Sequence, residues 1–195
     1  MAARAAGRED YDACWQLTEM EPPQDAPVAP SQPEADPFAR SQVVDQAGRP
    51  LVLYHGTDAK FDVFERSDDI GFHFGPRETA EARLRQAGMR NGRLMPVHVA
   101  ISNPLRLPDL HTWAPNPVLA ALEDAGVITG EQADAVDSVD RETVRTLLAS
   151  KGYDGIVYAN KTEGGGDSYI AFRPEQVRNA DKPIASITAT WEKVI

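Results

Sequence analysis

The sequence from residue 51 to residue 57 reads LVLYHGT and joins an apolar run to a histidine and a glycine. Short runs of branched and aromatic side chains favour a β-strand. The strand leads to His55, and Gly56 has no side chain, so a ligand can approach the backbone closely there. A histidine in this place can donate a hydrogen bond to a sugar hydroxyl, and the backbone of Gly56 can pair with a carboxamide. The alternative is a histidine that only caps the end of a strand.

A second short strand, bounded by glycines, is predicted at residues 71–75, GFHFG. Alternation along a strand places Phe72 and Phe74 on one face and His73 on the other. If the two phenylalanines face the core, His73 faces a cleft, where its flat ring can stack on a heteroaromatic ligand. The alternative is an ordinary strand with a solvated histidine.

The third region of interest is residues 163–172, EGGGDSYIAF. Three consecutive glycines before a strand are costly to order, and a simple hairpin does not need them. They suggest a mobile loop that sets the carboxylates of Glu163 and Asp167 at the opening of a strand. Such a carboxylate can hold a ribose hydroxyl and stabilise an oxocarbenium-like transition state. The alternative is a flexible acidic loop without function.

The chain of 195 residues is long enough for one folded domain with an extension. Residues 1–40 are expected to form a short helix and an acidic linker, partly disordered, because six prolines lie between residues 21 and 37. The domain is predicted over residues 41–182, followed by a C-terminal strand or tail at residues 183–195. Helices are predicted at residues 79–89, 117–125 and 140–150, and further strands at residues 94–101, 155–158 and 168–172. Helices inserted among many short strands indicate an α+β fold.

Composition excludes several classes of protein. The formal charge of −10 disfavours a nucleic-acid partner, because phosphate binding needs a cationic surface. No apolar run is long enough for a transmembrane helix, and residues 1–8 lack the apolar core of a secretory signal. A cytoplasmic protein, or one delivered into a host cytosol, with no membrane partner is therefore expected. Cys14 is the single cysteine and cannot form an internal disulfide.

The common nucleotide-binding and hydrolase motifs are missing from the sequence. No Gly-x-Gly-x-x-Gly follows a predicted strand, and neither Gly-x-x-x-x-Gly-Lys-Ser/Thr nor Gly-x-Ser-x-Gly occurs. A metal hydrolase would have to use the four histidines, which are His55, His73, His98 and His111. Their separations of 18, 25 and 13 residues match no compact set of metal ligands, so no metal site is predicted.

Taken in order, the three regions resemble the ADP-ribosyltransferase superfamily, on the side of diphtheria toxin and the poly(ADP-ribose) polymerases with their His…Tyr…Glu signature. The nearest likeness is to the small ADP-ribosyltransferase domains of bacterial, phage and mobile-element polyvalent proteins. Those domains also carry segments similar to NPLRL at residues 103–107, GYDGIVY at residues 152–158 and RPEQV at residues 173–177. The resemblance covers about residues 42–180. It implies a split, strongly bent, β-sandwich-like sheet with inserted helices, in a toxin or effector of a bacterium or phage.

The resemblance also assigns roles by position. His55 matches the histidine that bonds the ribose hydroxyls of NAD, and Gly56 matches the glycine whose backbone binds the nicotinamide amide. His73 falls where the polymerases have a tyrosine that stacks on nicotinamide. NAD is the implied co-substrate, and no metal is implied. The residues implied to contact NAD are Tyr54, His55, Gly56, Thr57, Phe72, His73, Phe74 and Ser168.

The third region departs from the family pattern. Aligning the strand YIAF puts Ser168 at the position of the catalytic glutamate, with Asp167 one residue earlier and Glu163 five residues earlier. A one-residue shift turns a side chain to the other face of an ideal strand. The catalytic set implied is therefore His55 and His73 with either Asp167 or Glu163 as the acid.

The resemblance implies an NAD-dependent mono-ADP-ribosyltransferase, which cleaves the nicotinamide–ribose bond and transfers ADP-ribose to a macromolecule, expected to be a protein. An NAD glycohydrolase side activity would accompany it. Ser168 motivates one alternative, a non-catalytic module that binds NAD or ADP-ribose. His73 motivates another, an enzyme like the NAD-dependent RNA 2′-phosphotransferases, although the net charge of −10 disfavours an RNA substrate.

Overall fold

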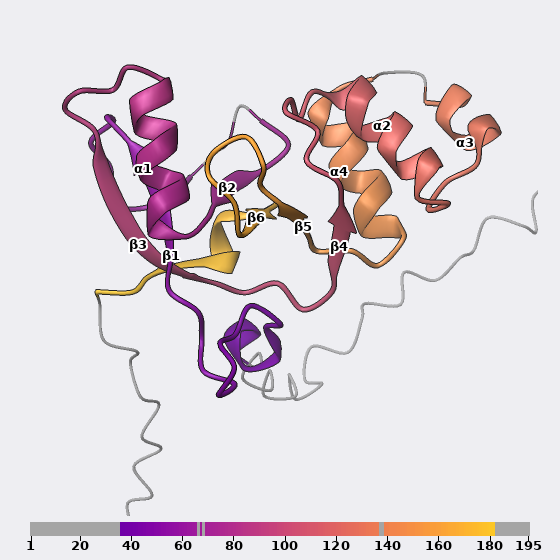
Figure 1. Cartoon of the computed structure of the whole chain (residues 1–195). Coiled ribbons are helices and arrows are strands. Elements are labelled where there is room, and N and C mark those ends of the chain that lie inside the picture. The colour runs from indigo at the N-terminus through magenta and orange to yellow at the C-terminus, as the bar shows by residue number, and fades with distance from the viewer. Residues whose placement is uncertain (1–35, 66, 68, 137–138, 182–195) are drawn as a thin grey trace, which may run out of the picture. The chain divides into compact units, whose positions relative to one another are not determined.

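The computed structural model describes residues 36–65, 67, 69–136 and 139–181, and Figure 1 shows them as a ribbon. The predicted N-terminal helix, nearly all of the proline-rich linker and the predicted C-terminal tail lie outside these residues. Helices are inserted among two separate β-sheets, so the predicted α+β class is confirmed. Within the described residues, no helix is long and apolar enough to cross a membrane.

The smaller sheet has three antiparallel strands. Its order is β1-β3-β7, from β1 (Leu53–Thr57), β3 (Arg93–Val99) and β7 (Val177–Asn179). The larger sheet has the order β2-β6-β5-β4, from β2 (Phe72–Phe74), β6 (Asp167–Ala171), β5 (Gly155–Ala159) and β4 (Pro104–Leu107). Its pairs are antiparallel except for β4 with β5, which are parallel.

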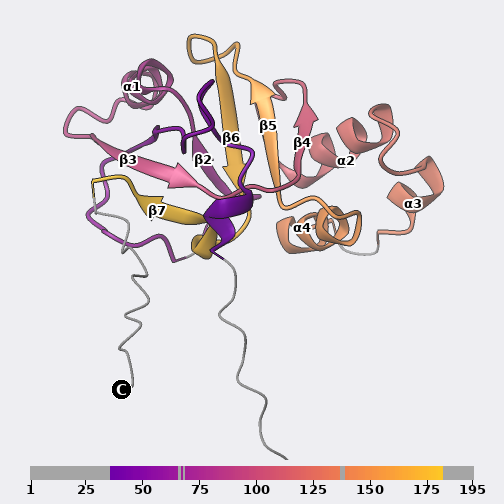
Figure 2. The same ribbon diagram turned by 90° about the horizontal axis from the view of Figure 1, so that it is seen from below.

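Four α-helices and two 3₁₀-helices connect the strands of the described chain. They are α1 (Arg77–Gln86), α2 (Pro115–Asp124), α3 (Gly130–Asp134) and α4 (Arg141–Ser150), with 3₁₀ turns at Pro37–Arg40 and Pro174–Gln176. Asp140 starts α4 by accepting a hydrogen bond from the Thr143 backbone N–H at 2.8 Å, as an N-cap residue does. Figure 2 shows α1 near β3 at one end and α2 and α4 near β4 at the other, with α3 beyond α2.

The described residues form two hydrophobic cores, and the larger sheet contributes to both. In the first, Leu122 of α2 and Leu148 of α4 pack with Ile156 and Ile170 of the larger sheet. The second core joins apolar side chains of the smaller sheet to β2, and its members include Leu53, Met95, Val97, Phe72 and Phe74. The second core therefore anchors β1 and β2, the two strands that carry the histidines singled out in the sequence.

The two sheets are joined where β1 passes the end of β2. Tyr54 donates its N–H to the Gly75 carbonyl at 2.8 Å and accepts the Gly75 N–H at 3.1 Å. This pair of hydrogen bonds sets His55 and His73 beside each other, although they lie on strands of different sheets. Two sheets joined at one bridge are compatible with the split sheet that the resemblance implies, and its strong bending stays a prediction.

Candidate functional site

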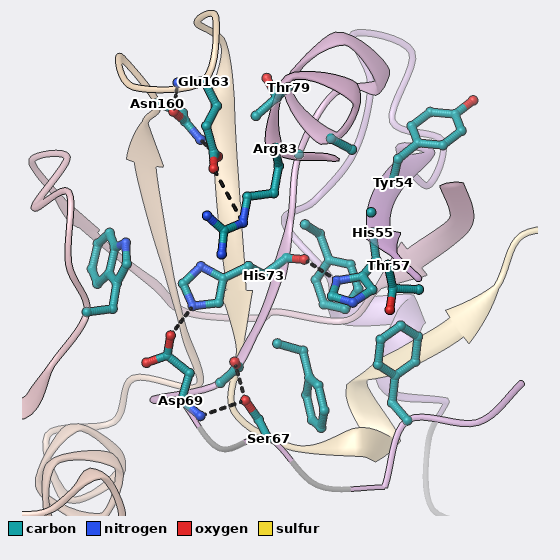
Figure 3. A pocket seen from close by; sticks show the side chains of 18 of the residues that line it. Tyr54, His55, Thr57, Ser67, Asp69, His73, Thr79, Arg83, Asn160 and Glu163 are labelled. Atoms are coloured by element: carbon teal, nitrogen blue, oxygen red, sulfur yellow. Dashed lines mark hydrogen bonds and ion pairs between the residues drawn. The ribbon is translucent and has the colours of Figure 1, made fainter. Parts of the chain in front are cut away.

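A cavity of about 1150 Å³ lies at the junction of the two sheets. Its walls come from β1, β2, residues 61–65, 67 and 69, the first turns of α1, the loop around His111 and the turn between β5 and β6. Figure 3 shows the part of it around His55, His73 and Glu163. Most of the residues singled out in the sequence line it, namely Tyr54, His55, Gly56, Thr57, Phe72, His73, Phe74 and Glu163. Asp167 and Ser168 are not among its lining residues.

His55 is held by its neighbours in one tautomer. Its Nδ1 lies 2.9 Å from the carbonyl oxygen of His73, and its ring packs edge-on against Phe64 with centroids 5.3 Å apart. Burial lowers the pKa of His55, although the bond to the His73 carbonyl opposes this shift. Because a carbonyl can only accept, Nδ1 carries the proton, and Nε2 of the neutral ring is an acceptor. His55 is therefore set to accept a hydrogen bond from a ligand hydroxyl rather than to donate one.

The strand β2 alternates as the sequence predicts. Phe72 and Phe74 are buried in the core, although both also border the cavity, while the His73 side chain keeps 30% of its surface exposed. The His73 ring has its Nε2 3.5 Å from the Asp69 carboxylate and its centroid 6.2 Å from that of Trp113. An aromatic wall and an acid thus hold the imidazole from two sides.

Asp69 was not singled out in the sequence. Burial would raise its pKa, but the nearby His73 ring and a hydrogen bond from the Ile70 N–H at 2.7 Å outweigh this, and the pKa of Asp69 is lowered. Its other carboxylate oxygen lies 3.7 Å from Nε of Arg141, which belongs to α4. The carboxylate therefore stays ionised and orients His73 from a loop that the helix supports.

Glu163 faces the cavity from the turn after β5. Its carboxylate accepts a hydrogen bond from Asn160 Nδ2 at 2.8 Å, and its own N–H donates to Asn160 Oδ1 at 2.8 Å. Only 18% of the Glu163 side chain is exposed, and its second oxygen lies 3.8 Å from Nε of Arg83 (Figure 3). The buried Asn160 thus fixes the Glu163 carboxylate. The only signal for Asn160 in the sequence is its position just after the strand predicted at residues 155–158.

Asp167 and Ser168 occupy opposite sides of β6, as expected of neighbours on a strand. Asp167 forms a two-point pair with the Arg106 guanidinium at 3.0 and 2.6 Å, and this hydrogen bonding lowers the pKa of Asp167. Ser168 is buried, and its hydroxyl accepts a hydrogen bond from Asn160 Nδ2 at 3.2 Å. The same Asn160 nitrogen bonds to Glu163, so Ser168 supports the carboxylate from behind.

The turn that carries Glu163 is pinned at its first half. Asp109 accepts hydrogen bonds from the Lys161 and Thr162 N–H groups at 2.9 and 3.1 Å and from the Thr162 hydroxyl at 2.9 Å. That hydroxyl lies 2.6 Å from Nδ1 of His111, whose backbone has a φ of 58°. Since the hydroxyl donates to Asp109, it accepts from the His111 ring. None of these four contacts was predicted from the sequence.

The second half of the turn explains the three glycines. The backbone φ angles of Gly164, Gly165 and Gly166 are 108°, 98° and 81°, which residues other than glycine rarely adopt. The Thr79 hydroxyl of α1 donates to the Gly165 carbonyl at 3.0 Å. The glycines are therefore required by the shape of the turn, which is also tied to α1.

Gly56 has a packing role in addition to its place in the cavity. A Cβ atom at this position would lie 2.8 Å from the backbone oxygen of Ala80 and 3.0 Å from Cγ of Leu84. The first contact is closer than a Cβ atom tolerates and the second is very tight, so α1 rests directly on the backbone of β1 at this glycine.

Of the four histidines, three line the cavity and His98 does not. His98 lies on β3, with its Nδ1 3.2 Å from the Leu51 carbonyl. In the part of the chain that the structure describes, no group of three His, Cys, Asp or Glu side chains could hold a metal ion.

Comparison with known proteins gives one family match. A family model described as ADP-ribosyltransferase in polyvalent proteins matches residues 45–186, a range that contains every residue of the cavity. No curated protein matches the chain. Among solved structures, the chain is similar to one titled "Crystal structure of an anti-CRISPR protein", with a TM-score of 0.33 and 14% identity, over 66% of this chain and 93% of that one.

Proposed function

The chain belongs to the family of ADP-ribosyltransferases found in polyvalent proteins, and we propose that it is an NAD-dependent mono-ADP-ribosyltransferase with a protein as acceptor. The observation that carries the proposal is the meeting of His55, His73 and Glu163 around one cavity. These residues come from three separate regions of the sequence: His55 and His73 lie on strands of different sheets, and Glu163 lies in the turn between β5 and β6. The cavity of about 1150 Å³ is slightly above the usual range of roughly 300–1,000 Å³ for ligand pockets, which suits a dinucleotide.

The edge of β1 supports binding of the nicotinamide carboxamide. Tyr54 uses both its N–H and its C=O to bond Gly75. Alternate residues of an antiparallel strand direct these groups to the same edge, so Gly56 presents its N–H and C=O two residues further along that edge. A carboxamide has an acceptor oxygen and an NH₂ group, so it can accept from the Gly56 N–H and donate to the Gly56 C=O.

Two imidazoles then hold the nicotinamide riboside half of NAD. His55 accepts a hydrogen bond from a ribose hydroxyl at Nε2, because Nδ1 is already committed to the His73 carbonyl at 2.9 Å. His73 provides a flat ring for stacking, and Asp69 and Trp113 keep this ring in place. Neither contact requires a charged histidine.

Glu163 acts on the bond that breaks. The electron pair of the bond between the ribose C1 and nicotinamide leaves with nicotinamide, and positive charge develops on the ribose ring. The carboxylate of Glu163 stabilises this charge, as a fixed charge in a partly buried site can. An acceptor nucleophile then bonds to C1 and loses its proton, and with water in its place the product is free ADP-ribose. Asp167 is not assigned this role because Arg106 already pairs with its carboxylate.

The test combines binding with cleavage. The unmodified chain, His55→Ala and His98→Ala are compared for NAD affinity and for nicotinamide release, with NAD labelled in its adenylate half and added to a cell lysate. His55→Ala should weaken NAD binding by about tenfold or more, because it leaves a ligand hydroxyl without its partner. His98→Ala is the matched control, since His98 lies outside the cavity, and it should bind NAD normally.

Each alternative has its own outcome in this experiment. Label transferred to lysate protein supports the proposal, and equal NAD affinity for His55→Ala and the unmodified chain contradicts the site. Tight binding of NAD without nicotinamide release would instead indicate a binding module. Loss of the phosphate from a 2′-phosphorylated RNA, only when NAD is present, would indicate the phosphotransferase reaction.

A further inference from the structure

The charges around the cavity are strongly unbalanced. Arg83 is the only lysine or arginine among the described residues that line it. The acidic side chains of the same wall are Asp62, Glu65, Asp69, Asp109 and Glu163. A ligand that carries negative charge therefore has one permanent cation to bind.

Arg83 is held loosely and Glu163 firmly. Arg83 projects from α1 with 59% of its side chain exposed, and its Nε lies 3.8 Å from one Glu163 oxygen (Figure 3). Ion pairs with an exposed partner are weak and are easily exchanged for another partner. The Glu163 carboxylate, in contrast, also bonds to the buried Asn160 at 2.8 Å. When this pair separates, the arginine is the member that moves.

The proposed reaction makes opposite demands on the two members of the pair. NAD carries two negative charges on its diphosphate, and a guanidinium binds phosphate oxygens through paired N–H donors. Glu163 can stabilise a developing cation fully only when no other cation neutralises it. A guanidinium left on Glu163 would lower the rate, and a diphosphate without a cation would bind poorly among the acidic residues.

We propose that Arg83 exchanges partners during the reaction cycle. Without ligand it is paired with Glu163, and when substrate binds it moves to the diphosphate and leaves the carboxylate free for catalysis. This inference rests on NAD as the substrate, and it adds a residue that binds the diphosphate and a coupling between substrate binding and release of the catalytic carboxylate.

The experiment measures the affinity of ADP, which has the diphosphate but lacks the nicotinamide ribose, and of adenosine, which has no phosphate. Arg83→Ala should weaken ADP binding by about tenfold or more, as expected for loss of a charge-assisted contact, and should leave adenosine binding unchanged. Arg85→Ala is the matched control. Arg85 lies on the same helix, pairs with Glu81 at 4.0 Å and does not line the cavity, so ADP binding should not change.

The exchange itself is tested with Glu163→Gln. This substitution removes the competing partner of Arg83, so ADP should bind about two- to fivefold more tightly. The gain should vanish in the double variant Arg83→Ala/Glu163→Gln, because the released guanidinium is then absent. Glutamine is close in size to glutamate, and an exposed helical alanine is well tolerated, so both variants should fold.

The outcomes separate this inference from the proposed function. If the unmodified chain binds NAD and ADP but Arg83→Ala binds ADP equally well, the diphosphate contact is wrong and the proposed function stands. If Arg83→Ala weakens ADP binding but Glu163→Gln does not strengthen it, the exchange is wrong. If the unmodified chain binds neither NAD nor ADP, the proposed function itself fails.

Discussion

Glu163→Gln and Asp167→Asn form a pair of substitutions that distinguishes the two candidate acids. Each replaces a carboxylate by an amide of nearly the same size. In Glu163→Gln, the remaining amide oxygen can still accept the hydrogen bond from Asn160, which is 2.8 Å long in the unmodified chain. The position of the side chain is therefore retained, and only its negative charge is lost from the cavity.

The expected magnitudes differ by orders of magnitude between the two sites. Removal of a group that stabilises charge in the transition state lowers kcat by about 10²–10³, or about 2.7–4 kcal/mol. Glu163→Gln should show this loss with little change in stability, because its pair with Arg83 at 3.8 Å is half exposed to solvent. Asp167→Asn breaks the pair with Arg106, which is worth up to about 1 kcal/mol at the surface, and leaves the cavity intact.

The assay is release of nicotinamide from NAD under single-turnover conditions, together with a thermal melt of each variant. Glu163→Gln should melt within a few degrees of the unmodified chain and be nearly inactive. Asp167→Asn should lose about 2–4 °C and keep its turnover. The reverse pattern, an active Glu163→Gln and an inactive but folded Asp167→Asn, would refute the assignment of the acid.

Three further predictions concern the other residues of the cavity. Gly56→Ala places a methyl group 2.8 Å from the Ala80 backbone oxygen, so it should lower the free energy of unfolding by about 1–3 kcal/mol in a thermal melt. Gly130→Ala is the control, because the added methyl group meets only the flexible end of the Glu123 side chain. Burial lowers the pKa of His55 below its usual 6.5. Between pH 6.5 and this lowered pKa, the unfolded chain therefore binds a proton that the folded chain does not, and the free energy of unfolding falls as the pH is lowered through this range. His55→Asn keeps a hydrogen-bond donor but cannot take up a proton. Urea titrations of this variant should therefore show a smaller fall in the free energy of unfolding over the same pH range. His73→Tyr should keep its turnover if the ring acts by stacking, and a loss of kcat with unchanged NAD affinity would point to a proton or phosphate role.

Local sequence patterns predicted most of the elements that carry the site. The phenylalanines of β2 are buried and His73 lies on the other face, as period-two alternation requires. The predicted helix at residues 79–89 is found at Arg77–Gln86, a shift of two or three residues at each end. The strand β4 was missed because it has only four residues and pairs with β5, about fifty residues further along the chain. Long-range pairing of this kind leaves no period in a single sequence.

The residues that the sequence did not reveal share a physical reason. Asp69, Asp109 and Asn160 act through hydrogen bonds or ion pairs that follow from tertiary structure, and Asp109 meets Thr162 across more than fifty residues. Isolated acids and amides in polar loops look like ordinary surface residues in the sequence. The sequence predicts a mobile loop from the three glycines, which stays a prediction, and the structure adds a second reason for them, because all three have a positive φ.

The proposed function, with Glu163 as the acid, offers a physical explanation for the departure at the third region. The alignment of the strand YIAF with the family pattern compares the two sequences residue by residue. It therefore places Ser168 at the position where the resemblance implies a glutamate. In the fold, Ser168 and Glu163 bond to the same Asn160 nitrogen, at 3.2 and 2.8 Å. Under the proposed function, the turn before β6 thus brings a carboxylate to the cavity, which Ser168 on the strand itself does not line. The left-handed glycines let the chain fold back far enough for this, which makes a serine on the strand compatible with an acid in the cavity.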